Sequence, residues 1–213
     1  MGAEPLTING GGVTLPVSDL GALRNIAGDN TYGGTITLAS QARINSDSGT
    51  LTLNNPSAVS SVGRTLVIGG AGNTTISGAI ALGSGGVAKG GTGTLTLSGA
   101  NTYTGNTSLN VGVLNMTGSL TGNGTPTAGS NLLYGVDPGN SVLNISGNIT
   151  NYFRFQGATN AAANAAYIQT GGTVNFTSTS TTSPTHAVAT AGYGYMEITG
   201  GTMRAGGRFA PSN

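Results

Sequence analysis

The feature that most restricts the fold is an alternation of aliphatic and hydroxyl side chains in short runs. In GTLTLSG, which starts at Gly93, Leu95 and Leu97 fall on one side of an extended chain and the Thr and Ser residues on the other. Each run is bounded by Gly, Asn or Ser, and none has the 3.6-residue period of an amphipathic helix. The sequence therefore predicts an all-β chain of short strands joined by tight turns. Similar runs lie at residues 35–38, 50–53, 65–68 and 143–145.

Three segments interrupt this pattern. The Ala-rich stretch 161–166 is too short to stand alone as a helix, so we expect a loop with at most one turn of helix. Residues 121–130 read as a Gly/Thr/Pro-rich bend, and the low-complexity stretch 178–185 as an exposed loop or an excursion between coils. We expect one elongated domain over residues 1–213, with divergent coils and longer loops over 125–213.

Two sequence units recur along the chain. The stretch GDNTYGGTITLAS, residues 28–40, aligns without gaps on GANTYTGNTSLNV, residues 99–111. Later, QTGGTVNF from Gln169 resembles ITGGTMRA from Ile198. Recurrence of strand–turn units at tens of residues indicates a solenoid.

A coil of three short strands explains why such a chain would fold. Every aliphatic residue then points into a shared tube and every Thr into water, while each coil hydrogen-bonds to its neighbours about 4.8 Å away. Gly and Asn supply the corners between strands. On this reading the stretch 90–116 contains three strands and forms about one winding. The prediction requires Leu95, Leu97, Leu109 and Leu114 to converge on one interior.

Composition excludes several classes of protein. Only 6% of residues are charged and the net charge is +1, which provides no field to attract nucleic acid or an anionic membrane. The chain has no Cys, so disulfides and thiolate metal sites are excluded. It shows no apolar span of about 20 residues and no visible signal peptide. We expect a piece of a longer array.

The stretch GTGTLTLSGANTYTGNTSLNVGVLN resembles the autotransporter-associated β-strand repeat, and the resemblance extends from about residue 21 to 116. It implies a right-handed parallel β-helix in a secreted or surface-displayed bacterial passenger, with three short strands per coil. The motif residues would shape a coil and carry no chemistry. The residues on the repeat pattern are Gly91, Gly93, Thr94, Leu95, Leu97, Gly99, Asn101, Thr102, Tyr103, Gly105, Thr107, Gly112 and Leu114.

Catalytic constellations are not evident in the sequence. A nucleophilic triad needs a rigidly held His, and the single His, His186, falls in what reads as a solvated loop. A sugar-cleaving enzyme needs paired carboxylates. Asp29 and Asp47, which stacking could bring together, both lie in turn-like contexts where Asp caps backbone groups. The acids are Glu4, Asp19, Asp29, Asp47, Asp137 and Glu197.

Metal and phosphate motifs are incomplete. The stretch 69–73 starts like a calcium-binding β-roll, but Thr74 stands where the Asp ligand is needed. Lys89 follows a Gly-rich stretch without the Ser or Thr of a phosphate loop. We therefore expect no cofactor and no metal. Tyr32 and Tyr103, each before a Gly corner, are expected to cover the edge of a coil rather than bind sugars.

The sequence thus predicts a non-catalytic stalk segment, extracellular or on the bacterial surface, whose partners are neighbouring coils of the same chain and surface glycans or host matrix. Two alternatives remain. One is a glycan-binding module that uses the loops after residue 120, with Tyr152 and Arg154 as ligand contacts. The other is a polysaccharide lyase or hydrolase, which requires two facing acids. Outward Thr pairs at 35/37, 50/52 and 94/96 are interpreted as exposed strand faces.

Overall fold

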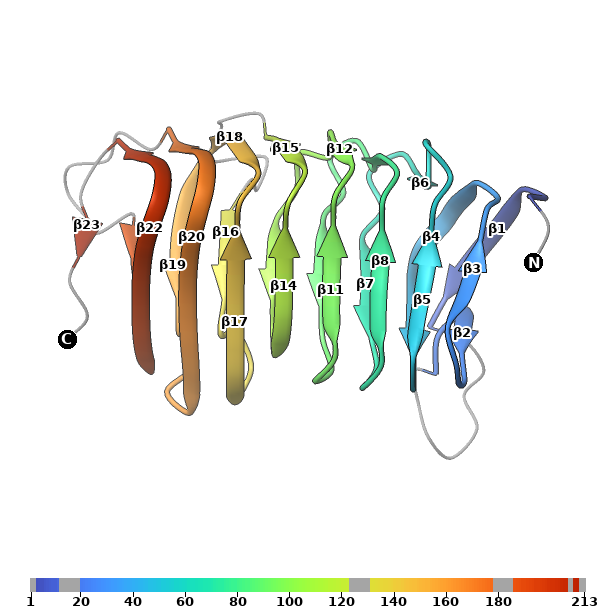
Figure 1. Ribbon diagram of the computed structural model, residues 1–213, viewed down its shortest axis with the longest axis horizontal. Coiled ribbons are helices and arrows are strands. Elements are labelled where there is room, and N and C mark those ends of the chain that lie inside the picture. Colours follow the sequence, from blue (N-terminus) through green and yellow to red (C-terminus); the bar gives the residue numbers. More distant parts are fainter. Residues whose placement is uncertain (1–2, 12–19, 123–130, 178–185, 207–208, 211–213) are drawn as a thin grey trace.

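The computed structural model describes residues 3–11, 20–122, 131–177, 186–206 and 209–210. Within these residues the chain consists of strands and turns, and every strand pairing is parallel. Figure 1 shows the strands side by side along the long axis of the molecule, from the N-terminus at one end to the C-terminus at the other. The prediction of an all-β chain is confirmed, and its parallel strands are what stacked coils require.

Between residues 50 and 157 strand pairing repeats at every third element, so three consecutive strands form one layer and the next three stack on them. Examples are the pairs β7 (Leu66–Gly69) with β10 (Val87–Lys89), β8 (Asn73–Ile76) with β11 (Thr94–Leu97), and β12 (Ala100–Asn101) with β15 (Ser119–Thr121). Corresponding strands of successive layers form three rows. Two sheets, of 12 and 11 strands, contain these rows. The backbone groups of short strands are thus satisfied by neighbouring layers rather than by a hairpin partner.

The first row contains the later half of β4 (Ile36–Ser46), followed by β7, β10, β13, β16, β19, β21 and β23. β2 (Leu23–Asn25) also pairs with this half of β4, and β1 (Leu6–Gly10) runs beside both halves. The remaining strands of this row are β7 (Leu66–Gly69), β10 (Val87–Lys89), β13 (Thr107–Leu109), β16 (Asn131–Tyr134), β19 (Arg154–Gly157), β21 (His186–Ala187) and β23 (Phe209–Ala210).

The second row runs from β3 to β22, and the third contains the shorter strands. β20 and β22 are long enough to serve both rows, turning from one to the other where the register shifts. The second row comprises β3 (Asn30–Tyr32), β5 (Thr50–Leu53), β8 (Asn73–Ile76), β11 (Thr94–Leu97), β14 (Gly112–Met116), β17 (Gly139–Ile145), β20 (Ala163–Phe176) and β22 (Tyr193–Ala205). The third comprises the first half of β4, β6 (Val59–Ser60), β9 (Ile80–Ala81), β12 (Ala100–Asn101), β15 (Ser119–Thr121) and β18 (Asn148–Tyr152), and then β20 and β22.

The alternating aliphatic residues line one interior. Leu95, Leu97, Leu109 and Leu114 are each at most 1% exposed and belong to a single buried cluster, which confirms their predicted convergence. The intervening hydroxyl residues of β5 and β11 are only half-buried and face outward. Thr52, Thr75 and Thr96 form one outward column across three layers.

One layer is shorter than the sequence pattern indicated. Leu95 of β11 pairs with Leu114 of β14, so the stretch 90–116 returns to the row of β11 after 19 residues and spans more than one layer. The prediction omitted the two-residue strand β12, whose Asn101 carries no alternating pattern to reveal it. Asn101 is buried and its side chain accepts a hydrogen bond from Ile80 N at 3.2 Å, linking β12 to β9.

Residues 163–166 of the Ala-rich segment form a strand rather than the loop that we expected, and only residues 161–162 lie in a turn. Ala163 and Ala165 belong to β20, and they pair with Gly139 and Ser141 of β17 in the preceding layer. Alanine has little strand preference of its own, but the edge of β17 offers a complete row of backbone partners. Of the bend expected at residues 121–130, Thr121 ends strand β15 and residues 123–130 lie outside the described residues, as does the low-complexity segment 178–185.

Candidate functional site

The tyrosines that the sequence placed at coil edges point into the interior. Tyr103 is fully buried and its hydroxyl lies 2.8 Å from Thr107 Oγ1. Thr107 Oγ1 lies 2.9 Å from the hydroxyl of Tyr152, which also donates to Gly105 O at 3.2 Å. Tyr32 is 7% exposed and donates to the carbonyl of Glu4. The expected edge-covering position of Tyr32 and Tyr103 is therefore wrong.

Tyr152 and Arg154, the expected ligand contacts, point to different environments. Tyr152 is fully buried between layers, so its ring is not available to a ligand on the surface. Arg154 is half-buried and its guanidinium carbon lies 5.0 Å from the centre of the Phe153 ring. The pair does not form a surface site, because the alternation of β18 and β19 that exposes Arg154 turns Tyr152 inward.

His186 is a buried strand residue, not the solvated loop residue that its neighbours Ser and Pro indicated. It lies in β21, is fully buried, and its Nε2 is 2.6 Å from Gly206 O. Its ring also packs at 5.5 Å from that of Phe176. Burial lowers the pKa of His186, which favours the neutral ring. An uncharged His held by a backbone carbonyl has a structural role here.

The acidic residues hold local structure. Asp29 Oδ1 accepts a hydrogen bond from Thr50 N at 2.8 Å, as the predicted capping requires. Asp47 instead forms an ion pair with Arg24, and the hydrogen bond from that guanidinium lowers the pKa of the carboxyl. Asn73, beside the missing calcium ligand, repeats the Asp29 arrangement and accepts from Thr94 N at 3.0 Å. Among the described residues no three His, Asp or Glu side chains gather as metal ligands would. Asp19 lies outside them.

Among the described residues Lys89 is the one buried cation. It is 2% exposed, and its Nζ donates to the carbonyls of Gly90 at 2.8 Å and Gly91 at 2.7 Å, with Val111 O at 3.4 Å. It occupies an inward position that Ile68 and Leu109 fill in the adjacent layers. Burial and, to a smaller extent, the charge of Arg43 together lower the pKa of Lys89 to about 8. The ammonium donates hydrogen bonds to backbone carbonyls at this corner, which an aliphatic side chain would leave without a donor.

Lys89 gives a pH dependence with a defined sign. Between pH 8 and 10.5 the unfolded chain retains a proton on Lys89 that the folded chain releases, so the free energy of unfolding should rise with pH. Burial raises the pKa of Tyr103 and Tyr134, so stability falls again once unfolded tyrosines ionise near pH 10. Across this window, we expect the free energy of unfolding of the wild-type protein to rise by about 2–3 kcal/mol relative to that of the Lys89→Met variant. Urea titrations of both proteins from pH 7 to 10.5 measure the gain; parallel curves would contradict it.

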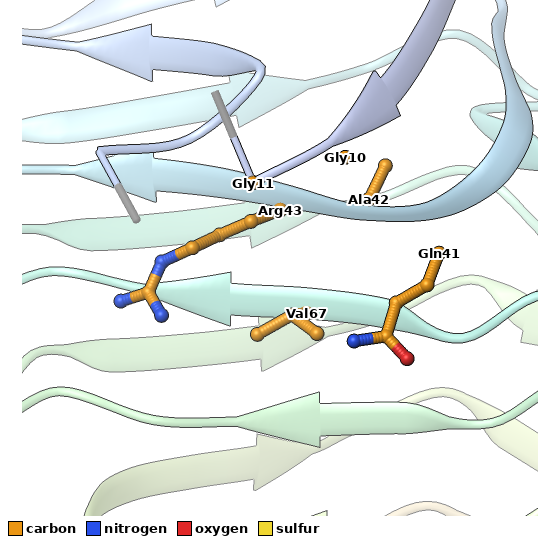
Figure 2. A pocket seen from close by; sticks show the side chains of 6 residues that line it. All are labelled: Gly10, Gly11, Gln41, Ala42, Arg43 and Val67. Atoms are coloured by element: carbon orange, nitrogen blue, oxygen red, sulfur yellow. The ribbon is translucent and has the colours of Figure 1, made fainter. Parts of the chain in front are cut away.

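Figure 2 shows a groove on the outer side of the first row, near the N-terminal end. Arg43 and Gln41 point to opposite sides of Val67. The volume of the groove is about 230 Å³. Arg43 Nε donates to Asn45 Oδ1 at 3.2 Å, which turns the guanidinium along the strand. The groove therefore holds no convergent set of polar groups. Its lining residues are Gly10, Gly11, Gln41, Ala42, Arg43 and Val67.

A second groove lies on the outer side of the second row, where β17, β20 and β22 are neighbours. Its volume is about 400 Å³, and it carries the two exposed tyrosines of the described residues, Tyr193 and Tyr195. The sequence analysis overlooked both. The alternation in YGYME was the available signal, because it places two Tyr residues on one strand face.

Comparison with known proteins identifies one family. Residues 87–116 match the family model of the passenger-associated-transport-repeat, which confirms the resemblance found in the sequence for this stretch. The match covers β10 to β14, more than one full layer. No curated protein and no solved structure matches the chain. Among the described residues, no helix is present that is long and apolar enough to cross a membrane.

Proposed function

We propose that the chain is a segment of right-handed parallel β-helix that serves as a non-catalytic stalk in a secreted or surface-displayed bacterial protein. The observation that carries this proposal is the stacking of parallel strands in successive layers along the long axis, with pairing at every third strand between residues 50 and 157 (Figure 1). The passenger-associated-transport-repeat match over residues 87–116 supports the surface or extracellular location.

A stack of this kind gains stability as it lengthens. Each layer contacts only its two neighbours, so stability is a sum of layer and interface contributions and grows with the number of layers. Thr107 of one layer, for example, lies between the hydroxyls of Tyr103 and Tyr152, which joins successive layers inside the tube. Continuous interior packing together with ladders in three rows would transmit force along the axis.

The placement of reactive side chains favours a structural role over catalysis. Asp29, Lys89 and His186 each contact backbone groups of an adjacent corner or strand. A glycoside-cleaving enzyme instead needs two carboxyl groups facing each other at roughly 5–9.5 Å. The hydrogen-bonding groups of Asp47 and Glu197 are engaged by Arg24 and Tyr195, and each lies in a different part of the stack.

Adding whole layers tests the proposal. Because Val87 pairs with Thr107, residues 87–106 make up one layer, and three extra tandem copies inserted after Asn106 should extend the stack. We expect a folded protein whose maximum dimension by small-angle X-ray scattering increases by about 14 Å, three spacings of about 4.8 Å. The matched control inserts three copies of residues 87–96, which return the chain to the wrong row and should abolish cooperative unfolding. Equal behaviour of both insertions would refute the stacked-coil architecture.

The location is tested separately on intact cells. Protease added to the native host should digest this segment while a cytoplasmic marker survives. Protection of the segment until the cells are lysed would argue against surface display without affecting the test of architecture.

A further inference from the structure

Two tyrosines stand out on the surface near the C-terminal end. Tyr193 is 81% exposed and Tyr195 is 55% exposed, and both lie on the outer face of β22 with Gly194 between them. Side chains two residues apart on a strand are roughly 7 Å apart and parallel in direction. Such exposed aromatic pairs are costly in solubility and usually mark an interaction site.

The strands beside β22 complete a groove. Tyr193 pairs with Asn164, and Tyr195 with Ala166, in the layer before it. One layer further, Asn164 pairs with Asn140 and Ala166 with Val142. The groove therefore has two tyrosine rings at one side, small apolar side chains in its floor, and a column of two amides along its length.

The amides are oriented and still available. Asn164 Nδ2 donates to Asn140 Oδ1 at 3.0 Å, which fixes the two planes relative to each other. Both side chains are exposed, so the amide of Asn140 keeps donor capacity and that of Asn164 keeps acceptor capacity toward the groove. Tyr195 donates its hydroxyl to Glu197 at 2.7 Å, which holds its ring in place.

We propose that this groove, bounded by Tyr193, Tyr195, Asn140 and Asn164, binds a neutral oligosaccharide. Sugar rings present apolar C–H faces that pack on aromatic rings, and hydroxyls that pair with amides, so they match both halves of the groove. The site goes beyond the stalk role: it makes this end of the chain a recognition surface. It also differs in position from Tyr152 and Arg154, the contacts expected from the sequence.

Charge narrows the ligand class. No Lys or Arg lines the groove, and Glu197 lies next to Tyr195, so an anionic sugar or a nucleic-acid strand would meet no compensating charge. A ligand that stacks on tyrosine without needing a cation is a neutral glycan. Binding should accordingly be insensitive to salt.

A printed array of neutral and acidic oligosaccharides tests the proposal, followed by calorimetry with the neutral glycan that gives the strongest signal. We expect the double variant Tyr193→Ala/Tyr195→Ala to lose affinity about 10-fold or more, because both aromatic stacking contacts are removed. Asn164→Ala should weaken binding less, and Tyr193→Phe should retain it. Val62→Ala, which trims another highly exposed apolar residue, is the matched control.

Each result decides the matter. Absence of any neutral-glycan binding by the wild-type protein, or equal binding by the double variant, overturns the proposal. Sedimentation equilibrium shows whether the tyrosines instead join two copies of the chain: a wild-type dimer that the double variant dissociates, without glycan binding, would also overturn it. Circular dichroism of the variants separates this failure from a failure of the fold, since both tyrosines lie outside the buried cluster.

Discussion

Replacing Leu95 with aspartate is expected to abolish cooperative folding. Leu95 is completely buried in β11, between Thr74 of β8 and Leu114 of β14 in the adjacent layers. Truncating a buried leucine alone costs about 2–5 kcal/mol, and burying a carboxyl group without a partner adds several more. The sum reaches the whole stability of an ordinary domain, about 5–15 kcal/mol. Far-UV circular dichroism and urea titration measure the loss.

The neighbouring position provides the control. Thr96 is only half-buried, faces outward, and pairs with Thr75 and Asn115. Thr96→Asp introduces the same charge one residue away, where water solvates it, so we expect a change within about 0.5 kcal/mol. Comparable destabilisation by both substitutions would show that the two sides of β11 do not differ as described. It would contradict the shared interior that contains Leu95.

A single methyl group at Gly93 is expected to be the second most damaging change. A Cβ built there would overlap the carbonyl oxygen of Gly72 in the preceding layer, and the atoms it meets belong to backbone, which cannot rotate away. Gly93→Ala must therefore push two layers apart, at a cost of about 2–3 kcal/mol. The midpoint of urea denaturation should fall accordingly.

Gly90 is the matched control for this substitution. It lies three residues earlier, a Cβ there meets no atom within 4 Å, and its φ does not need a glycine. Gly90→Ala should leave stability unchanged or raise it by about 0.4–1 kcal/mol, because it restricts the unfolded chain. If both variants lose stability equally, the backbone conformation of this turn rather than layer contact determines the requirement for glycine.

Alternation made the strands and their buried side predictable from the sequence. A period of two assigns every second residue to one face, and Leu95 and Leu114 therefore had to share an interior if the layers stack. The number of residues per layer was harder to predict. The two-residue strand β12 is too short to show an alternating pattern, so the sequence predicted a layer longer than the one observed. Likewise, Ala163 enters a strand because β17 offers a free edge, a tertiary cause that local composition cannot show.

Side-chain positions near corners were the least predictable. His186 and Tyr152 each follow polar residues in the sequence, yet both are fully buried, because a corner that turns by one residue exchanges inside and outside. Tyr193 and Tyr195 show the opposite outcome, since the same alternation exposes large aromatic rings. The groove beside them depends on pairing with β17 and β20 across two layers, which only the register reveals.

The distribution of tyrosines gives the C-terminal layers a spectroscopic signal of their own. The chain has no Trp and seven Tyr, of which Tyr32 alone precedes residue 100. Tyr134 and Tyr167 pack with Phe155 in one aromatic cluster, with ring centres 5.0 and 4.9 Å from that of Phe155. Near-ultraviolet dichroism will therefore follow the melting of the C-terminal layers almost exclusively. Comparison with the far-ultraviolet dichroism signal, which averages over all strands, would reveal whether the two ends of the stack unfold together or one after the other.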